Sequence, residues 1–105
     1  MVRYQVKPEQ AAANEELVRA VFDELHRVEP TGFGYVTFQL EDGVTFVHLV
    51  SESEDGDRPV SLADMPAFQK FLEGIGDRCD VAPVATGMRE IASYRLFSDA
   101  ASSPA

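Results

Sequence analysis

The segment 33–50 constrains the fold of this chain more than any other part of the sequence. Two runs rich in β-branched and aromatic residues flank an Asp42-Gly43 pair. Asp-Gly between such runs is a strong signal for a two-residue hairpin turn, because both turn positions need a positive φ. The sequence therefore predicts two antiparallel strands joined at this pair, in a register that places Thr37 opposite His48.

This register divides the side chains of the hairpin between the two faces of a sheet, since successive residues of a strand point to opposite sides. One face is almost wholly apolar, and we expect the helices to cover it: Val36, Phe38, Leu40, Thr45, Val47 and Leu49. The other face mixes aromatic, aliphatic and hydrogen-bonding groups: Tyr35, Thr37, Gln39, Phe46, His48 and Val50. With the helices on the first face, this mixed face would expose a larger apolar patch than a monomer normally carries. The pattern therefore predicts that the mixed face packs against a second copy of the chain or lines a ligand cavity.

The segments around the hairpin alternate between the apolar period of a strand and that of a helix. The predicted order is strand, helix, hairpin, helix and strand, over about residues 2–6, 10–28, 33–51, 65–75 and 84–97. The first strand is expected to turn Val2, Tyr4 and Val6 toward the helices. In the long last strand, Gly87 is expected to mark a bulge or a bend.

Two β-α-β units that share one sheet give the ferredoxin-like arrangement. The predicted fold class is therefore α+β, in the order β-α-β-β-α-β, with a four-stranded antiparallel sheet and two helices on one of its faces. We expect one domain over residues 1–97, because 105 residues can bury one core but not two. The small and polar residues 98–105 are expected to form a disordered tail.

The charge of the chain excludes several classes of partner. The chain contains nine lysines and arginines and eighteen aspartates and glutamates, so its net charge is −9. A nucleic-acid-binding protein, in contrast, needs a basic surface. No apolar run approaches the roughly 20 residues that span a bilayer. We therefore expect neither nucleic acid nor a membrane as a partner. A cytoplasmic location is expected, because residues 1–6 do not read as a signal peptide and the single Cys79 cannot form an internal disulfide.

Five short segments carry a resemblance to a known family: 3–8 (RYQVKP), 34–38 (GYVTF), 45–50 (TFVHLV), 65–71 (MPAFQKF) and 93–97 (SYRLF). Together they resemble the dimeric α/β-barrel superfamily, close to its antibiotic-biosynthesis-monooxygenase-like proteins, over about residues 1–97. The resemblance implies a homodimer in which two ferredoxin-like sheets form a barrel, with a pocket between sheet and helices in each subunit. Some such proteins oxidise polycyclic phenols with molecular oxygen and no cofactor, so no cofactor is expected here.

His48 is the candidate catalytic residue. It lies in the middle of a predicted strand, beside Phe46 and opposite Thr37, and imidazole is the natural base near neutral pH. A cofactor-independent oxygenase needs such a base to convert an electron-rich substrate into its anion. The alternative is a histidine whose ring is only hydrogen bonded within a dimer interface.

Two functions therefore stay open. The first is a cofactor-independent monooxygenase that acts on an aromatic or polyketide-like small molecule with His48 as the base. The second is a non-catalytic small-molecule-binding or stress-associated dimer that uses the same cavity. The residues expected to line this cavity, or the dimer face, are Tyr35, Thr37, Gln39, Phe46 and Val50. The histidines and the cysteine show no ligand spacing, so no metal site is predicted.

Overall fold

Strands and helices follow one another along the chain in the predicted order. In the computed structural model they are β1 (Val2–Val6), α1 (Ala11–Val28), β2 (Phe33–Gln39), β3 (Thr45–Glu52), α2 (Pro66–Leu72), α3 (Ile75–Arg78) and β4 (Cys79–Ala85). The structure describes residues 1–30, 33–52 and 62–95. The predicted tail, 98–105, lies outside these residues.

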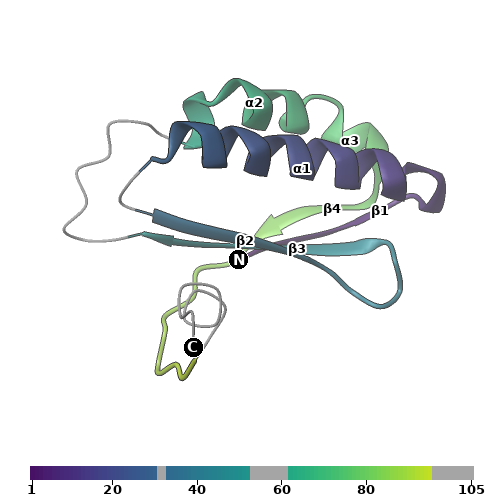
Figure 1. The fold of residues 1–105 in the computed structure, drawn as a ribbon. Coiled ribbons are helices and arrows are strands. Elements are labelled where there is room, and N and C mark those ends of the chain that lie inside the picture. Colours follow the sequence, from purple (N-terminus) through teal and green to yellow (C-terminus); the bar gives the residue numbers. More distant parts are fainter. Residues whose placement is uncertain (31–32, 53–61, 96–105) are drawn as a thin grey trace.

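The four strands form one antiparallel sheet in the order β2-β3-β1-β4, and the helices lie together on one of its faces (Figure 1). This arrangement confirms the predicted α+β class and the ferredoxin-like topology. β4 is an edge strand, so it can contain Pro83, which has no N–H to donate to a neighbouring strand. Among the described helices, none is long and apolar enough to cross a membrane.

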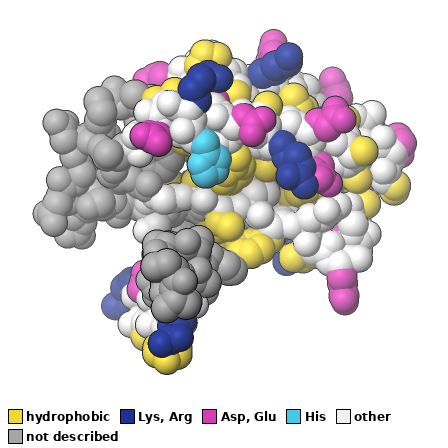
Figure 2. All heavy atoms as spheres, viewed as in Figure 1, with side chains coloured by type: hydrophobic (Ala, Val, Ile, Leu, Met, Phe, Trp, Pro, Cys, Tyr) yellow, Lys and Arg dark blue, Asp and Glu magenta, His cyan; other side chains and the backbone are white. Residues whose placement is uncertain are grey.

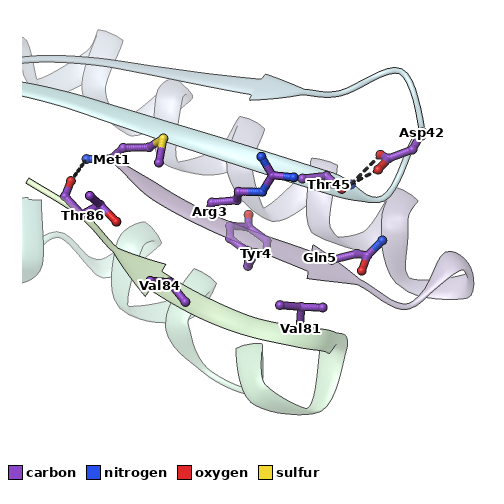
Figure 3. Close-up of a pocket in the computed structure, with 9 residues that line it drawn as sticks. All are labelled: Met1, Arg3, Tyr4, Gln5, Asp42, Thr45, Val81, Val84 and Thr86. Atoms are coloured by element: carbon purple, nitrogen blue, oxygen red, sulfur yellow. Dashed lines mark hydrogen bonds between the residues drawn. The ribbon is translucent and has the colours of Figure 1, made fainter. Parts of the chain in front are cut away.

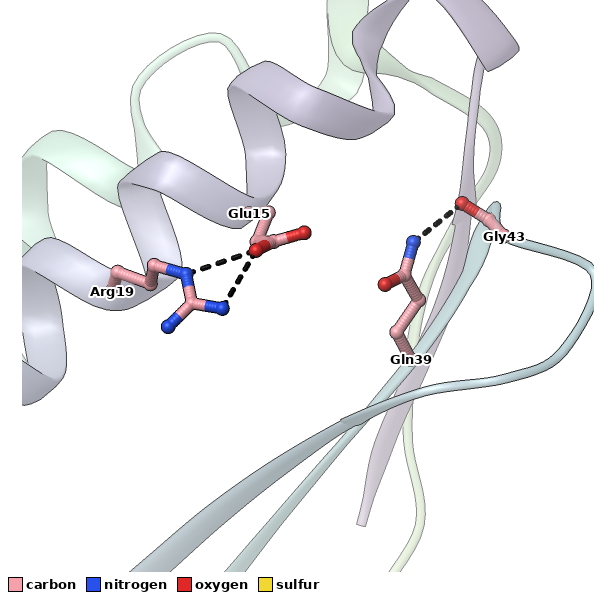
Figure 4. Close-up of polar contacts among 4 residues, drawn as sticks. All are labelled: Glu15, Arg19, Gln39 and Gly43. Atoms are coloured by element: carbon pink, nitrogen blue, oxygen red, sulfur yellow. Dashed lines mark hydrogen bonds and ion pairs between the residues drawn. The ribbon is translucent and has the colours of Figure 1, made fainter.

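Helix α1 forms the larger part of the layer above the sheet. Its residues Val18 and Val21 are buried on the side that faces the sheet. On its outer side, Arg19 donates to Glu15 at 2.9 Å (Figure 4). Charged side chains of both signs are spread over this layer, and apolar side chains gather below it along the sheet (Figure 2). The helix ends at Val28, and the next residue, Glu29, has a left-handed backbone (φ 52) and donates its N–H to the Leu25 carbonyl at 2.7 Å.

The hairpin has the predicted register but a different turn. Thr37 pairs with His48, as the sequence predicts. Of the two turn residues, only Gly43 has a positive φ, 79°, and its N–H donates to the Leu40 carbonyl at 2.9 Å. The prediction of a turn with positive φ at both Asp42 and Gly43 is therefore wrong.

The carboxylate of Asp42 explains this turn. It accepts hydrogen bonds from the backbone N–H groups of Val44 and Thr45, at 3.0 and 2.8 Å, and from the Thr45 hydroxyl at 2.5 Å. These bonds from Thr45 and Val44 hold the pKa of the Asp42 carboxyl below its usual value. Hydrogen bonds to the Asp42 side chain thus stabilise the turn between β2 and β3, in addition to the backbone hydrogen bond of Gly43.

The two faces of the hairpin are the reverse of the prediction. Tyr4 on β1 lies opposite Phe46 on β3; both are buried, and their rings stack with centroids 5.6 Å apart. Paired residues share a face, so the mixed set lies on the helix side of the sheet: Tyr35, Thr37, Gln39, Phe46, His48 and Val50. The expectation that this set forms an uncovered dimer face is therefore wrong. The pairing of β3 with β1 decides which face the helices cover, and the sequence of the hairpin alone does not reveal this pairing.

The opposite side of the sheet, which no described helix covers, is called the open face below. It carries the set predicted for the core, two residues of β1 and the β4 residues that pair with them: Val36, Phe38, Leu40, Thr45, Val47, Leu49, Arg3, Gln5, Val84 and Val81. The sheet therefore turns its more apolar hairpin face away from the helices. The prediction for β1 is confirmed, because Tyr4 and Val6 are buried on the helix side.

The last strand lies earlier in the chain than predicted. β4 occupies 79–85, and residues 86–95 form no strand. Its ladder with β1 shifts register between Arg3 and Gln5 and again between Gln5 and Val6, so the irregularity lies within this pairing and not at Gly87. The alternating pattern of 91–97 resembles a strand, but residues 79–85 already occupy the free edge of β1.

Candidate functional site

His48 lies in the middle of β3, between the sheet and the helices, and only 5% of its surface is exposed. Its Nε2 is 2.8 Å from the Tyr4 hydroxyl, and its Nδ1 is 2.6 Å from the Tyr35 hydroxyl and 3.2 Å from Thr37 Oγ1. β1 and β2 flank β3, so each neighbouring strand brings a tyrosine to one side of the imidazole. Both ring nitrogens are therefore occupied by groups of the protein itself.

The hydrogen-bonded chain continues from Tyr4 into the helices. The Asn14 amide on α1 donates to the Tyr4 hydroxyl at 2.9 Å, and Asn14 Oδ1 accepts from Arg78 Nε at 3.3 Å. The other nitrogens of Arg78 donate to the carbonyl oxygens of Phe71 and Glu73, at 2.6 and 2.8 Å. Among the described residues, every buried side-chain nitrogen or oxygen has a hydrogen-bond partner. A satisfied network of this kind can remain in a core without a large cost.

These contacts indicate where the protons of the cluster lie. A tyrosine hydroxyl has one proton to donate, and that of Tyr4 already accepts from Asn14. We assign its own proton to His48 Nε2, the one remaining acceptor that its contacts offer. Nε2 is then the acceptor of the imidazole, and Nδ1 carries the proton toward Tyr35 and Thr37.

Burial keeps the side chains of His48, Tyr4 and Tyr35 uncharged at neutral pH. Burial lowers the pKa of His48 to about 4, because the imidazolium would lose its hydration. It raises the pKa of Tyr35 to about 12, and it also raises the pKa of Tyr4 above its usual value. An imidazole of such low pKa is a weak base for a phenol, and its acceptor nitrogen, Nε2, is already hydrogen bonded to the Tyr4 hydroxyl.

The predicted site residues separate into two groups. Tyr35 and Thr37 contact His48, and Phe46 packs beside it against the Tyr4 ring. Gln39 is exposed at the end of β2, and its amide donates to the Gly43 carbonyl at 2.8 Å (Figure 4). Val50 is 43% exposed near the other end of the hairpin. No finding tests the catalytic role of His48, which stays a prediction.

The buried cluster consists of the hydrogen-bonded side chains of Tyr35, Thr37, His48, Tyr4, Asn14 and Arg78. Two of these, Asn14 and Arg78, were not predicted from the sequence. Asn14 did have a signal, because it stands four residues before Val18 and seven before Val21, on the apolar side of α1. A polar residue in such a stripe is unusual and suggests a buried partner. Arg78 had no comparable signal, since it ends a four-residue helix at the start of β4.

A separate groove of about 400 Å³ opens on the open face of the sheet, where β1 and β4 meet the hairpin turn (Figure 3). Its walls combine polar and apolar side chains, among them Arg3, Gln5, Thr45, Val81, Val84 and Thr86. His48 does not line it. Tyr4, which belongs to the buried cluster, is also among the residues that line the groove.

Comparison of the chain with protein-family models, curated proteins and solved structures finds no match. The fold assignment therefore rests on the element order and the strand order given above. Within residues 1–30, 33–52 and 62–95, no three histidine, cysteine or acidic side chains gather in a way that could hold a metal ion.

Proposed function

We propose that this chain is a small-molecule-binding homodimer of the dimeric α/β-barrel type, in which the open faces of two sheets pair and enclose the groove. The observation that carries the proposal is the reversal of the hairpin faces. The helices cover the face that contains His48 and Thr37, while the more apolar face has no cover among the described residues. The segments that resemble the superfamily support the same assembly.

Apolar burial supports the pairing of the open faces. Each copy presents side chains of every strand on this face, and five of them are large hydrophobic residues of the hairpin: Val36, Phe38, Leu40, Val47 and Leu49. Burying one exposed side chain of this size stabilises an assembly by roughly 1.5–3 kcal/mol. These five are already half-buried, and two symmetric copies would remove the rest of their surface from water together.

The lining of the groove indicates the class of ligand. Val81 and Val84 supply apolar wall on β4, and the Arg3 guanidinium on β1 supplies a cation with several donors. The Asp42 carboxylate, which also borders the groove, already accepts from Val44 and Thr45. A volume of about 400 Å³ lies within the usual range of small-molecule sites. A small aromatic molecule with an acidic group fits this combination.

Binding of the fluorescent anion 8-anilinonaphthalene-1-sulfonate tests the proposal. We expect saturable binding to the native protein, weakened about tenfold by Arg3→Gln, because the sulfonate loses its cationic partner. Arg19→Gln is the matched control, since it removes the same charge from the exposed side of α1 and should leave binding unchanged. Equal binding by the wild type and both variants would show that Arg3 does not bind the sulfonate, and would contradict the proposed class of ligand.

A second candidate function is the cofactor-independent oxygenase, and the buried polar chain around His48 favours it. Five polar side chains, from Tyr35 through His48, Tyr4 and Asn14 to Arg78, meet in the core of a small domain. In this function Nε2 takes a proton from a phenolic substrate after the Tyr4 hydroxyl has moved away, and the resulting anion reacts with molecular oxygen.

Oxygen consumption with 1-naphthol as the probe tests this second function. The oxygenase function predicts uptake above the protein-free rate, lost in His48→Asn and retained in His26→Asn, which replaces the exposed histidine of α1. Uptake no faster than the protein-free rate, or equal in wild type and His48→Asn, would remove His48 from the chemistry. The groove function predicts that outcome.

A further inference from the structure

Residues 86–95, called the C-terminal arm below, belong to no strand of the described sheet, and Thr86 at their start exchanges backbone hydrogen bonds with Met1. All ten residues are exposed, and the three large apolar side chains are the most exposed of their kind in the described chain: Met88 at 59%, Ile91 at 81% and Tyr94 at 84%. Figure 1 shows the arm leaving β4 on the side of the sheet opposite the helices. The arm therefore carries its apolar side chains on the side of the molecule where the open face lies.

The start of the arm is held at a defined place. The Thr86 N–H donates to the Met1 carbonyl at 2.7 Å, and the Met1 amino group donates to the Thr86 carbonyl at 2.7 Å (Figure 3). Thr86 and Met1 also line the groove. The arm thus begins at the edge of the groove and runs away from its own sheet.

We propose that the C-terminal arm docks on the open face of a second copy of this chain, so that two copies exchange arms and each arm closes the partner's groove. This inference rests on the proposed dimer and adds what covers the groove. Each copy has one apolar arm and one apolar open face on the same side of the molecule. An exchange about a two-fold axis covers both arms and both open faces, and it therefore stops at two copies. The residues that alternate like a strand, 91–95, gain in this way the neighbouring strand that the described part of their own chain does not provide.

Charge also favours a second copy. The arm carries Arg89 and Arg95 against Glu90, so it is basic, whereas the whole chain has a net charge of −9. A basic arm is attracted to an acidic partner, and another copy of this chain is one. The Arg95 guanidinium lies 5.6 Å from the centre of the Tyr94 ring, so the two side chains can dock as a unit.

A single tryptophan in the arm can report this docking, because the natural chain contains none. We expect the emission of Tyr94→Trp to shift to the blue as the protein concentration rises from roughly 0.1 to roughly 100 μM, in step with dimerisation measured by sedimentation. Adding Ile91→Asp should weaken dimerisation at least about tenfold and move the shift to higher concentration by the same factor. Leu72→Trp, at an exposed apolar position on α2, is the control and should show no shift.

Three outcomes would overturn the proposal. If Tyr94→Trp sediments as a dimer but its emission stays that of a solvent-exposed tryptophan at every concentration, the chain dimerises without docking of the arm. Blue emission at a concentration where the protein sediments as a monomer would show that the arm folds onto its own sheet. A wild type that stays monomeric over the whole range would remove both the exchange and the proposed dimer.

Discussion

The Tyr4 hydroxyl is the residue-scale link between the strands and the helices. It accepts from Asn14 on α1 and donates to His48 on β3, while its ring stacks on Phe46. An unpaired polar group in a core costs more than the hydrogen bond itself contributes, because the group also loses its hydration. The stability of the core therefore depends on this one oxygen.

Replacing Tyr4 by phenylalanine isolates that oxygen. Tyr4→Phe keeps the stacked ring but leaves the Asn14 amide and His48 Nε2 each without a partner, so we expect the free energy of unfolding to fall by about 1–3 kcal/mol. Tyr94→Phe removes the same group from an exposed ring and should change the stability by no more than about 0.5 kcal/mol. Urea denaturation of both variants makes the comparison, and equal effects would contradict the network.

The low pKa of His48 predicts a particular dependence of stability on pH. The imidazole titrates near 6.5 when unfolded and near 4 when folded, so between these values the unfolded chain binds a proton that the folded chain does not. Stability is therefore complete above about pH 6.5 and falls as the pH is lowered toward about 4, by about 3 kcal/mol from this group.

Urea denaturation between about pH 7 and about pH 4 measures this loss, and the two histidine variants identify its source. His48→Asn lowers stability at neutral pH but removes the imidazole contribution to the acid loss, whereas His26→Asn retains it. An acid loss of the same size in His48→Asn and in the wild type would show that His48 is not the buried neutral group.

Helix α1 shows, at the scale of an element, how backbone strain can be relieved by a single change. Its final residue is followed by Glu29 in a left-handed conformation, which costs an L-residue roughly 1–2 kcal/mol. Glycine adopts this conformation without that penalty but loses more entropy on folding. We expect Glu29→Gly to raise the free energy of unfolding by about 0.5–1 kcal/mol.

The matched control is Ala20→Gly, an exposed position inside the same helix. It should lower the free energy of unfolding by about 1 kcal/mol, because a helix interior has no need of the freedom of glycine. Urea denaturation compares the two variants. Opposite signs are predicted, and a loss of stability in both would contradict the left-handed end of α1.

Periodicity and turn residues were enough to predict most elements. The strand at 2–6 and the helix that ends at Val28 follow directly from the spacing of apolar residues, and the register of the hairpin follows from the Asp-Gly pair. The last strand could not be placed in this way, because 79–85 and 91–97 both have strand character and only pairing with β1 distinguishes them. The turn itself depends on the Asp42 side chain, which backbone preferences do not describe.

Across the whole molecule, the assignment of faces could not be made from hydrophobicity. The rule that the more apolar face is covered by helices fails here, because Tyr4 supplies a hydrogen bond that makes burial of His48 possible. The candidate site was therefore predicted with the right neighbours, Tyr35 and Thr37, but on the wrong side of the sheet. Asn14 and Arg78 join the site only through the packing of helices on the sheet.

The central claim is that the open faces of two copies pair, and sedimentation equilibrium tests it most directly. Aspartates at two exposed apolar positions of the open face, in Val81→Asp/Val84→Asp, should weaken the dimer, because the charges lose their hydration in the interface. Val28→Asp/Leu72→Asp makes the same change at exposed positions of the helix layer.

We predict twice the mass of the chain for the wild type and for the helix-layer variant, and the mass of a single chain for the open-face variant at the same concentration. A monomeric wild type, or a dimer that the open-face variant leaves intact, would contradict the account.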